Sequence, residues 1–321
     1  MGRSMARTTT SALGGVLAVG AAAFAYGAIV ERNRFTVRSE HVPVLDAAAR
    51  PITVLHLSDL HMAPWQHRKQ EWIRALRTIE PDLIVNTGDN LGHPDGLVGL
   101  QAALEPFRGI PGVYVNGSND YFGPSFKNPF GYVLKPRTKR TASPGRLDTD
   151  AMEAYFASLG WLSLNNAARA IELRGARLEF FGVNDAHRGW DRLDQLPTIV
   201  EELRENVGWQ DEPGPEPVAI GVTHAPYRRV LDSFTTYGAE VIFAGHTHGG
   251  QVRIPGLPPL VTNCDIPREQ AQGLSIWHHG RHAAYLNVSA GIGTSIFAPV
   301  RFACPPEAVV MTLGPGDIGY S

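Results

Sequence analysis

Residues 241–250 read Val-Ile-Phe-Ala-Gly-His-Thr-His-Gly-Gly, an apolar run followed directly by a polar cluster. Four other parts of the chain repeat this arrangement, with an apolar run of strand length before each cluster. The runs are Ile52–Leu57, Leu83–Thr87, Val113–Val115 and Val218–Val222, and the clusters that follow them are Asp59-Leu60-His61, Gly88-Asp89-Asn90, Gly117-Ser118-Asn119-Asp120 and Thr223-His224-Ala225.

The five clusters are predicted to meet at one edge of a sheet. Loops held by a rigid sheet carry function, and open α/β sheets bind their ligands outside the carboxyl ends of strands. This edge would gather aspartate, histidine and asparagine side chains. Such a mixed set suits Mn, Fe, Zn or Co better than Ca, which prefers oxygen ligands alone. We therefore expect a site for two divalent metal ions.

The segments between the first runs have the spacing of helices. Apolar residues recur at helical intervals in 66–79 and again in 97–107, and prolines at 81 and 111 precede the next strands. Strands that alternate with helices predict a parallel sheet with crossover helices. The part beyond Val241 reads mainly as strands and turns. The fold class predicted from this pattern is α/β, a sheet core flanked by helices.

Composition limits the function classes. The chain has 321 residues, 43% of them hydrophobic, and a formal net charge of -2. There is ample material for a core, and residues 51–321 are predicted to form one domain. The small net charge does not indicate steering of nucleic acid, so no nucleic-acid partner is expected.

The amino-terminal region predicts a membrane segment. Residues 11–30 are apolar, uncharged and just long enough to cross a bilayer as a helix, after a basic stretch at 1–10. A cleaved signal peptide is the alternative. We expect an uncleaved transmembrane anchor, a polar extended connector at 31–50 and a location at a bacterial-type cell membrane.

Residues 123–150 form a basic insert rich in Pro, Gly, Lys and Arg. A loop of this length inside a domain is uncommon. It reads either as a solvated loop or as a lid that docks phosphate, and its position directly after the third cluster keeps the second reading open.

The spacing within the clusters supports shared metal ligation. Asp59 and His61 alternate by two, as do His246 and His248, so each pair places two side chains on the same side of an extended backbone. Asp89 has two carboxylate oxygens and is able to bridge two cations. Two such ions would activate a water, orient a phosphate and neutralise charge on its oxygens.

At these residues the chain resembles the calcineurin-like metallophosphoesterases. That family has Asp-x-His, Gly-Asp, Gly-Asn-His-Asp or Glu, a single His and Gly-His-x-His in this order. Within it, Gly291-Ile292-Gly293-Thr294-Ser295 and the segment around Pro299–Glu307 are similar to the membrane-linked phosphohydrolases of the YkuE and YaeI type. The resemblance implies a four-layer α/β/β/α sandwich of two mixed sheets with a dinuclear site.

The resemblance also implies the role of each residue. Asp59, His61, Asp89 and His248 would hold the first metal, and Asp89 would bridge to the second. His224, His246 and a residue of the third cluster would complete the second metal site. Asp89, Asn119 and His224 are the residues expected to take part in catalysis.

The third cluster departs from the family pattern. Ser118 stands where the metal-binding Asn is expected, and Asn119 stands where a His usually assists the leaving group. A shift of one residue would let Asn119 serve as the ligand, but the His would still be missing. General acid catalysis is worth about 10²–10⁴-fold, so its loss matters. His93 and His187 are candidate substitutes, although loop histidines of this kind are often only solvated.

The function expected from this reading is metal-dependent hydrolysis of a phosphoester by an activated hydroxide. The substrate would be small or membrane-associated, including a lipid-linked one. The alternative is a degenerate family member that binds metal or a partner without turnover. Arg301 has two readings as well, since it would either contact phosphate or form a structural ion pair.

Overall fold

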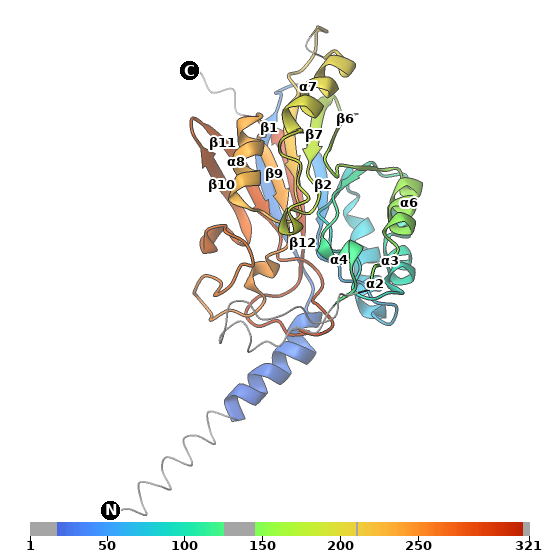
Figure 1. Cartoon of the computed structure of the whole chain (residues 1–321), viewed down its shortest axis with the longest axis vertical. Helices are drawn as coiled ribbons and strands as arrows, with labels where there is room; N and C mark the ends of the chain where they lie inside the picture. Colours follow the sequence, from blue (N-terminus) through green and yellow to red (C-terminus); the bar gives the residue numbers. More distant parts are fainter. Residues whose placement is uncertain (1–17, 125–144, 210, 317–321) are drawn as a thin grey trace, which may run out of the picture.

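Two six-stranded mixed sheets form the centre of the computed structural model, which describes residues 18–124, 145–209 and 211–316 (Figure 1). The first sheet has the order β1-β12-β2-β3-β4-β5. Its strands are parallel to their neighbours except for β12 and β2, which are antiparallel. The strands are β1 (Thr36–Leu45), β2 (Ile52–Leu57), β3 (Leu83–Asn86), β4 (Gly112–Tyr114), β5 (Trp161–Ser163) and β12 (Glu307–Pro315).

The second sheet has the order β10-β11-β9-β8-β7-β6. Its central pairs are parallel, and an antiparallel hairpin closes each end. The strands are β6 (Ala167–Leu173), β7 (Ala176–Gly182), β8 (Val218–Val222), β9 (Val241–Ala244), β10 (Gly273–His279) and β11 (His282–Val288).

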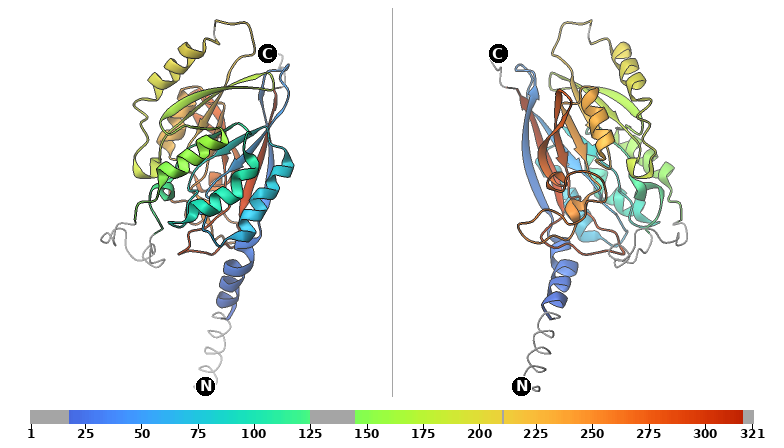
Figure 2. Two further views of the ribbon diagram at one scale, coloured as in Figure 1. Left: turned by 90° about the vertical axis from the view of Figure 1, so that its right-hand side faces the viewer. Right: turned by 60° about the vertical axis from the view of Figure 1, so that its left-hand side comes forward.

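Helices cover the outer face of each sheet, as two views of the molecule show (Figure 2). Against the first sheet lie α2 (His67–Ala75), α3 (Gly96–Leu104) and α6 (Thr149–Leu159), and α4 (Ser118–Tyr121) follows β4. Against the second lie α7 (Leu196–Val207) and α8 (Arg228–Thr236). The short η segments are η1 (Tyr26–Val30), η2 (Glu31–Asn33), η3 (Leu76–Ile79), η4 (Glu105–Phe107), η5 (Ala186–Arg188), η6 (His248–Gly250) and η7 (Arg268–Gln270).

Alternation along the strands explains the four layers. Successive side chains of a strand point to opposite faces. In β2, Val54 packs between the sheets, whereas Leu55 packs under the helices of the first sheet. In β9, Phe243 packs between the sheets, whereas Ile242 packs under α7 and α8. Three buried clusters therefore separate four layers in the order α/β/β/α, which agrees with the predicted architecture.

The expected connector at residues 31–50 is different in the structure. Residues Thr36–Leu45 form β1, an edge strand that runs parallel to β12 over the register from Thr36 opposite Glu307. Polar side chains alternate along it because one face of this edge strand is open to solvent. The connector thus contributes a strand to the first sheet. Most of the basic insert, residues 125–144, lies outside the described residues.

The predicted membrane anchor is corrected by the structure. None of the helices in the described part of the chain is both long enough and apolar enough to span a bilayer, and this overturns the predicted membrane location. Residues 11–17 of the predicted segment lie outside the described residues. Its carboxyl end packs on the domain: Arg301 donates its backbone N–H to the carbonyl of Gly27 at 3.2 Å, and the Tyr26 ring meets that of Phe302.

Candidate metal centre

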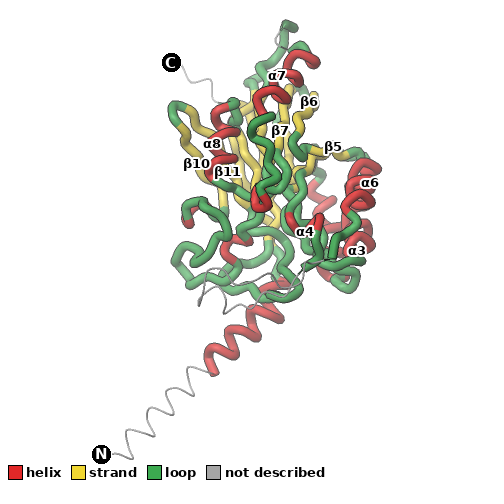
Figure 3. The backbone as a smooth tube through the Cα atoms, viewed as in Figure 1, coloured by secondary structure: helices red, strands yellow, loops and turns green. Residues whose placement is uncertain are grey.

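Loops gather at the end of the strands where the five polar clusters lie (Figure 3). The chain bends sharply there, and five predicted ligands hold a positive φ, namely Asp59, His61, Asp89, His246 and His248. A positive φ is uncommon for any residue with a side chain, and such backbones concentrate at functional sites. Eleven non-glycine residues of the described chain have this conformation, and five of them are predicted ligands of this one centre.

The side chains of Asp59, His61 and His248 converge on one point. Their ligand atoms lie within 4.8 Å of one another. Nε2 of His61 is 3.2 Å from Nε2 of His248, and Nε2 of His248 is 3.5 Å from Oδ1 of Asp59. That oxygen is buried and accepts no hydrogen bond within the described structure. A buried carboxylate oxygen without a donor is costly, and a cation at this point would satisfy it.

Asp89 lies between this group and a second one. Its Oδ2 is 3.6 Å from Nε2 of His61, and its Oδ1 is 3.5 Å from Nε2 of His224. His224 in turn lies 3.3 Å from Nδ1 of His246. Asp59, Asp89 and His224 form a second set whose ligand atoms lie within 4.8 Å. Asp89 therefore occupies the position that a bridging carboxylate needs.

Two of the proposed imidazole ligands are kept in the form that binds a cation. Burial, with the positive charge of Arg301, lowers the pKa of His248 to about 3, and burial lowers the pKa of His61 to about 4. Both imidazoles are thus neutral at pH 7, the state in which imidazole binds a metal. Burial acts against the charge on Asp89, but the neighbouring His224 outweighs it and holds the pKa of Asp89 well below its usual range.

Hydrogen bonds orient the rings. Nδ1 of His224 lies 2.8 Å from the carbonyl of Thr87, which leaves Nε2 to face Asp89. Nε2 of His246 lies 3.3 Å from the carbonyl of Asn263, which leaves Nδ1 to face the centre. Backbone carbonyls of this kind fix the tautomer of a metal-binding histidine.

Glycines make room for the close approach of the clusters. A Cβ on Gly117 would lie 2.3 Å from Oδ1 of Asp89 and 2.7 Å from Nε2 of His224. A Cβ on Gly245 would lie 1.9 Å from Oγ of Ser58. The glycines that open these two clusters are therefore needed for the packing of the neighbouring ones.

The third cluster lies beside Asp89, as the resemblance implied, but it binds differently. The amide nitrogen of Asn119 donates to Oδ2 of Asp89 at 2.6 Å, and its backbone N–H donates to Oδ1 at 2.8 Å. The hydroxyl of Ser118 donates to the buried carboxylate of Asp185. Asn119 and not Ser118 therefore faces the centre. Rotation of the Asn119 amide would present its oxygen in place of its nitrogen.

Asp120 is a supporting residue that the sequence analysis did not assign to the site. Its carboxylate accepts the backbone N–H groups of Asp89, Asn90 and Gly117 at 2.7–2.9 Å. It is fully buried and lies in the third cluster itself. Asp120 therefore holds the second and third clusters together.

The loop after β7 supplies two further residues that were not predicted. The carboxylate of Asp185 accepts from Ser118, and Nε of Arg188 donates to Oγ of the same serine at 3.4 Å. Asn184-Asp185 directly follows the short run at 180–183, Phe-Phe-Gly-Val, in the manner of the five clusters. This is the signal in the sequence that could have located the loop at the site.

A buried chain of hydrogen bonds supports Asp59 from behind. Ser58 donates to Oδ2 of Asp59 at 2.6 Å, and Thr87 donates to Ser58 at 2.6 Å. Nε2 of His56 lies 2.9 Å from Thr87, and Asn287 of the second sheet reaches Nδ1 of His56 at 2.9 Å. The orientation of Asp59 is thus tied to both sheets.

Three other candidate residues are distinguished by their contacts. His187 lies against His246, with ring centroids 4.7 Å apart, whereas His93 packs on Trp65. Of the two, His187 lies at the centre. Arg301 is fully buried and donates to the carbonyls of Ala290, Gly291 and Gly293 at 2.7–2.9 Å, so its role is structural.

This geometry defines a metal-dependent phosphoesterase centre, and comparison with known proteins agrees. The family model of the calcineurin-like phosphoesterases matches residues 52–250, and the chain belongs to this family. It is similar to two Bacillus subtilis (strain 168) proteins. The protein YpbG is 24% identical over 94% of this chain and 96% of its own length, and the metallophosphoesterase YkuE is 22% identical over 89% and 86%.

The chain is therefore a phosphoesterase, and divalent metal ions are its cofactors. Among solved structures, a purple acid phosphatase from yellow lupin matches 63% of this chain and 39% of its own with 11% identity and a TM-score of 0.39. The donor set fits the cofactor, because neutral imidazoles and an unpartnered carboxylate oxygen converge on the same point.

Proposed function

We propose that this chain hydrolyses a phosphoester that carries an apolar group, at a centre held by Asp59, His61, Asp89, Asn119, His224, His246 and His248. The unpartnered Oδ1 of Asp59, facing His248 beside a buried Asp89, is the observation that carries the proposal. A cation at this point would satisfy the oxygen, so the observation supports the metal binding on which the proposed hydrolysis depends.

Bound divalent metals would supply a nucleophile from water at neutral pH and draw charge from the phosphoryl oxygens. The protein groups hold the two halves of the centre together and orient the histidine rings. Asp89 joins the two halves of the centre, and Asp120 fixes the backbone of Asp89. The carbonyls of Thr87 and Asn263 keep the rings of His224 and His246 in one orientation.

Arg188 is proposed to contact the phosphoryl group in place of the histidine that the third cluster lacks. Its guanidinium lies 4.5 Å from the centroid of Phe122 and 3.4 Å from the Ser118 hydroxyl, next to the cluster where the family has a histidine. A guanidinium is always charged and matches phosphate oxygens in a bidentate manner. Arg188 would hold the phosphoryl group and would not donate a proton.

The apolar part of the substrate is inferred from the rim of the centre. The loop that follows the Gly-His-x-His cluster leads to Asn263, whose carbonyl contacts His246. Along it, Ile254, Leu257, Leu260 and Val261 are each about half exposed, with values of 50–54%. Exposed apolar side chains on a loop that leads into a site favour a ligand with an apolar portion, as a lipid-linked phosphate would have.

Hydrolysis of bis(p-nitrophenyl) phosphate by the manganese-loaded full chain tests the activity, with Asp89→Ala beside it. Turnover in the parent and its loss in the variant support the proposed centre. Full metal occupancy without turnover on phosphomonoesters or phosphodiesters would contradict it and would indicate a binding-only protein.

A series of p-nitrophenyl alkyl phosphates tests the apolar rim. KM should fall as the alkyl chain lengthens from methyl to octyl, by at most about fourfold per methylene. Leu257→Ser should weaken this dependence, whereas Val98→Ser, at another exposed apolar residue on α3, should not. A KM that is independent of chain length would exclude the apolar group.

A further inference from the structure

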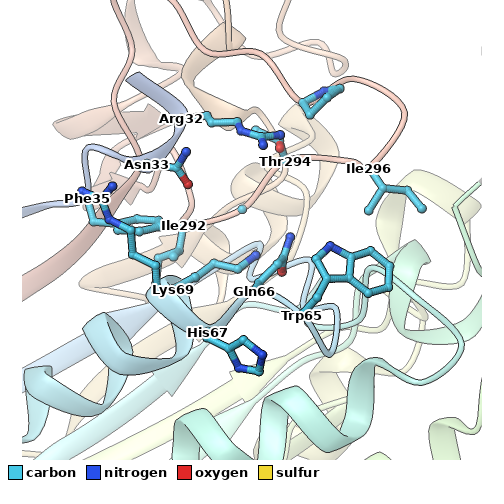
Figure 4. Close-up of a pocket in the computed structure, with 13 residues that line it drawn as sticks. Arg32, Asn33, Phe35, Trp65, Gln66, His67, Lys69, Ile292, Thr294 and Ile296 are labelled. Carbon is cyan, nitrogen blue, oxygen red and sulfur yellow. The ribbon is translucent and has the colours of Figure 1, made fainter. Parts of the chain in front are cut away.

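A second site lies against the backbone of the Asp59–His61 loop. It is a pocket of about 350 Å³, and its wall joins η2, the start of α2 and the loop after β11 (Figure 4). The amine of Lys69 lines it and donates to the carbonyls of Leu60 and His61. Gly293, on the opposite wall, donates its N–H to the carbonyl of Asp59 at 2.6 Å. None of the proposed metal ligands lines the pocket.

The pocket is cationic. Arg32, Arg68 and Lys69 line it, and the described residues of its wall include no aspartate or glutamate. Nε of Arg32 is buried and has no hydrogen-bond partner within the described part of the chain. A buried donor of a charged group without an acceptor costs free energy that an anion would recover.

The first turn of α2 faces the same space. Gln66, His67, Arg68 and Lys69 all line the pocket, and α2 begins there without a side-chain cap or an acidic residue in its first turn. The first N–H groups of a helix have no partner inside the helix, and its dipole favours an anion at this end. A helix start and two arginines thus converge on one cavity.

Three cationic side chains, Arg32, Arg68 and Lys69, line the same cavity, and no acidic residue of its described wall lies between them. Like charges in a medium of low polarity destabilise each other unless a counter-charge lies between them. The geometry of the cavity supplies the place for that counter-charge.

We propose that this pocket binds a phosphate-type anion, separate from the phosphoester that is hydrolysed. Arg32 is its principal ligand, and Arg68 and the first turn of α2 complete the site. The anion is either a second phosphate group of the substrate or free phosphate. Phosphate fits because planar guanidinium groups and helix N–H groups are both donors of the kind that phosphate oxygens accept.

Calorimetric titration of the manganese-loaded full chain with inorganic phosphate tests the site. We expect two phosphates per chain, one of which competes with bis(p-nitrophenyl) phosphate at the metal centre. Arg32→Gln should weaken the other about tenfold or more without a change in the inhibition constant for phosphate. Arg34→Gln, an exposed arginine two residues away that does not line the pocket, is the matched control.

One phosphate per chain, or two that Arg32→Gln leaves unchanged, would overturn the proposal. If Arg32→Gln does not fold by circular dichroism, Arg68→Gln takes its place, because Arg68 is exposed on the first turn of α2. The calorimetric count of bound phosphates needs no turnover, so it stands even if the proposed hydrolysis fails, and only the inhibition constant requires an active enzyme.

The source of the anion is distinguished by kinetics. If Arg32→Gln raises KM for an alkyl bisphosphate but not for the corresponding monophosphate, the second phosphate of the substrate occupies the pocket. If neither KM changes but Arg32→Gln no longer binds the second phosphate in the titration, the ligand is free phosphate. Both results support a phosphate site and differ only in what occupies it.

Discussion

The two halves of the metal centre differ in how their side chains are held. On the Asp59 side, the ligands are neutral imidazoles and a carboxylate oxygen that lacks any donor. On the Asn119 side, the amide donates to Asp89 and the Ser118 hydroxyl donates to Asp185. The first half is arranged for a cation before one is bound. The second is held by hydrogen bonds among protein groups and draws Arg188 from another loop.

This difference separates two tasks of one site. The proposed metal ligands are supplied by strand ends, and outside the third cluster these follow the family pattern without change. The proposed contact with the phosphoryl group lies at the third cluster, where the pattern has changed and Arg188 of the loop after β7 contacts Ser118. Substitutions in each half show whether the two tasks are separable.

The largest effect is expected from Asp59→Asn. Loss of this charge should remove one metal and lower kcat by about 10³-fold, because a catalytic metal is worth several kcal/mol of transition-state stabilisation. Metal content by mass spectrometry and kcat on bis(p-nitrophenyl) phosphate measure it. Asp95→Asn, at an exposed aspartate, is the control. Full activity with one metal would show that the Asp59 half is not the essential one.

Asp120→Asn should have a smaller effect, about 10–100-fold in kcat, as is usual for residues that orient a ligand. Asp120 touches both halves through the backbone of Asp89 and Gly117. Metal content should stay above that of Asp59→Asn. Equal metal loss in the two variants would mean that the halves are not separable.

Arg188→Gln should lower kcat/KM about tenfold, the value of one charged hydrogen bond, with metal content unchanged. The loss should be the same for good and poor leaving groups, since Arg188 holds the phosphoryl group and donates no proton. Arg192→Gln, which removes an arginine of the same loop that pairs with Asp194, should leave the rate as it is. A loss that grows with leaving-group pKa would instead indicate a general acid.

The last prediction concerns stability and pH. Burial, with the charge of Arg38, lowers the pKa of His56 to about 3. The unfolded state takes up a proton on this histidine below the ordinary imidazole pKa of about 6.5, whereas the folded state does not. Stability is therefore fully present above this pH and falls as pH drops toward the folded pKa. For each such histidine, the free energy of unfolding should fall by about 2 kcal/mol between about pH 6.5 and pH 5.

Urea unfolding of the metal-free protein across this range measures the slope. His56→Gln should flatten it, because the amide has no proton to take up. His67→Gln, at an exposed histidine, should not change it. An unchanged slope in His56→Gln would show that the histidine is not held neutral behind the Asp59 half.

The sequence predicted the parts of the molecule that are encoded locally. The strands β2, β8 and β9 begin and end where the apolar runs do, because a buried strand and its loop differ in composition over a few residues. The predicted ligands do come together, but the prediction of one sheet edge was wrong, because the clusters follow β2, β3 and β4 of the first sheet and β8 and β9 of the second. The family and its cofactor were also predicted, and the family model confirms them.

Features that depend on distant partners were not predicted. β1 reads as a polar connector because it is an edge strand whose register is set by β12, about 270 residues later. Asp185 and Arg188 reach the centre only through the fold of the loop after β7. The membrane prediction rested on the hydropathy, length and basic flank of residues 11–30, which do not distinguish a spanning helix from a segment whose carboxyl end packs on the domain through Gly27.

The left-handed backbone at five of the proposed ligands has a consequence for affinity. The unfolded chain rarely samples such conformations, and the surrounding sheets impose them when the protein folds. A metal ion consequently meets preorganised ligands and loses little conformational entropy on binding. The tightness of the centre is then a property of the scaffold, and short peptides that carry the same motifs should bind metal far more weakly than the folded chain.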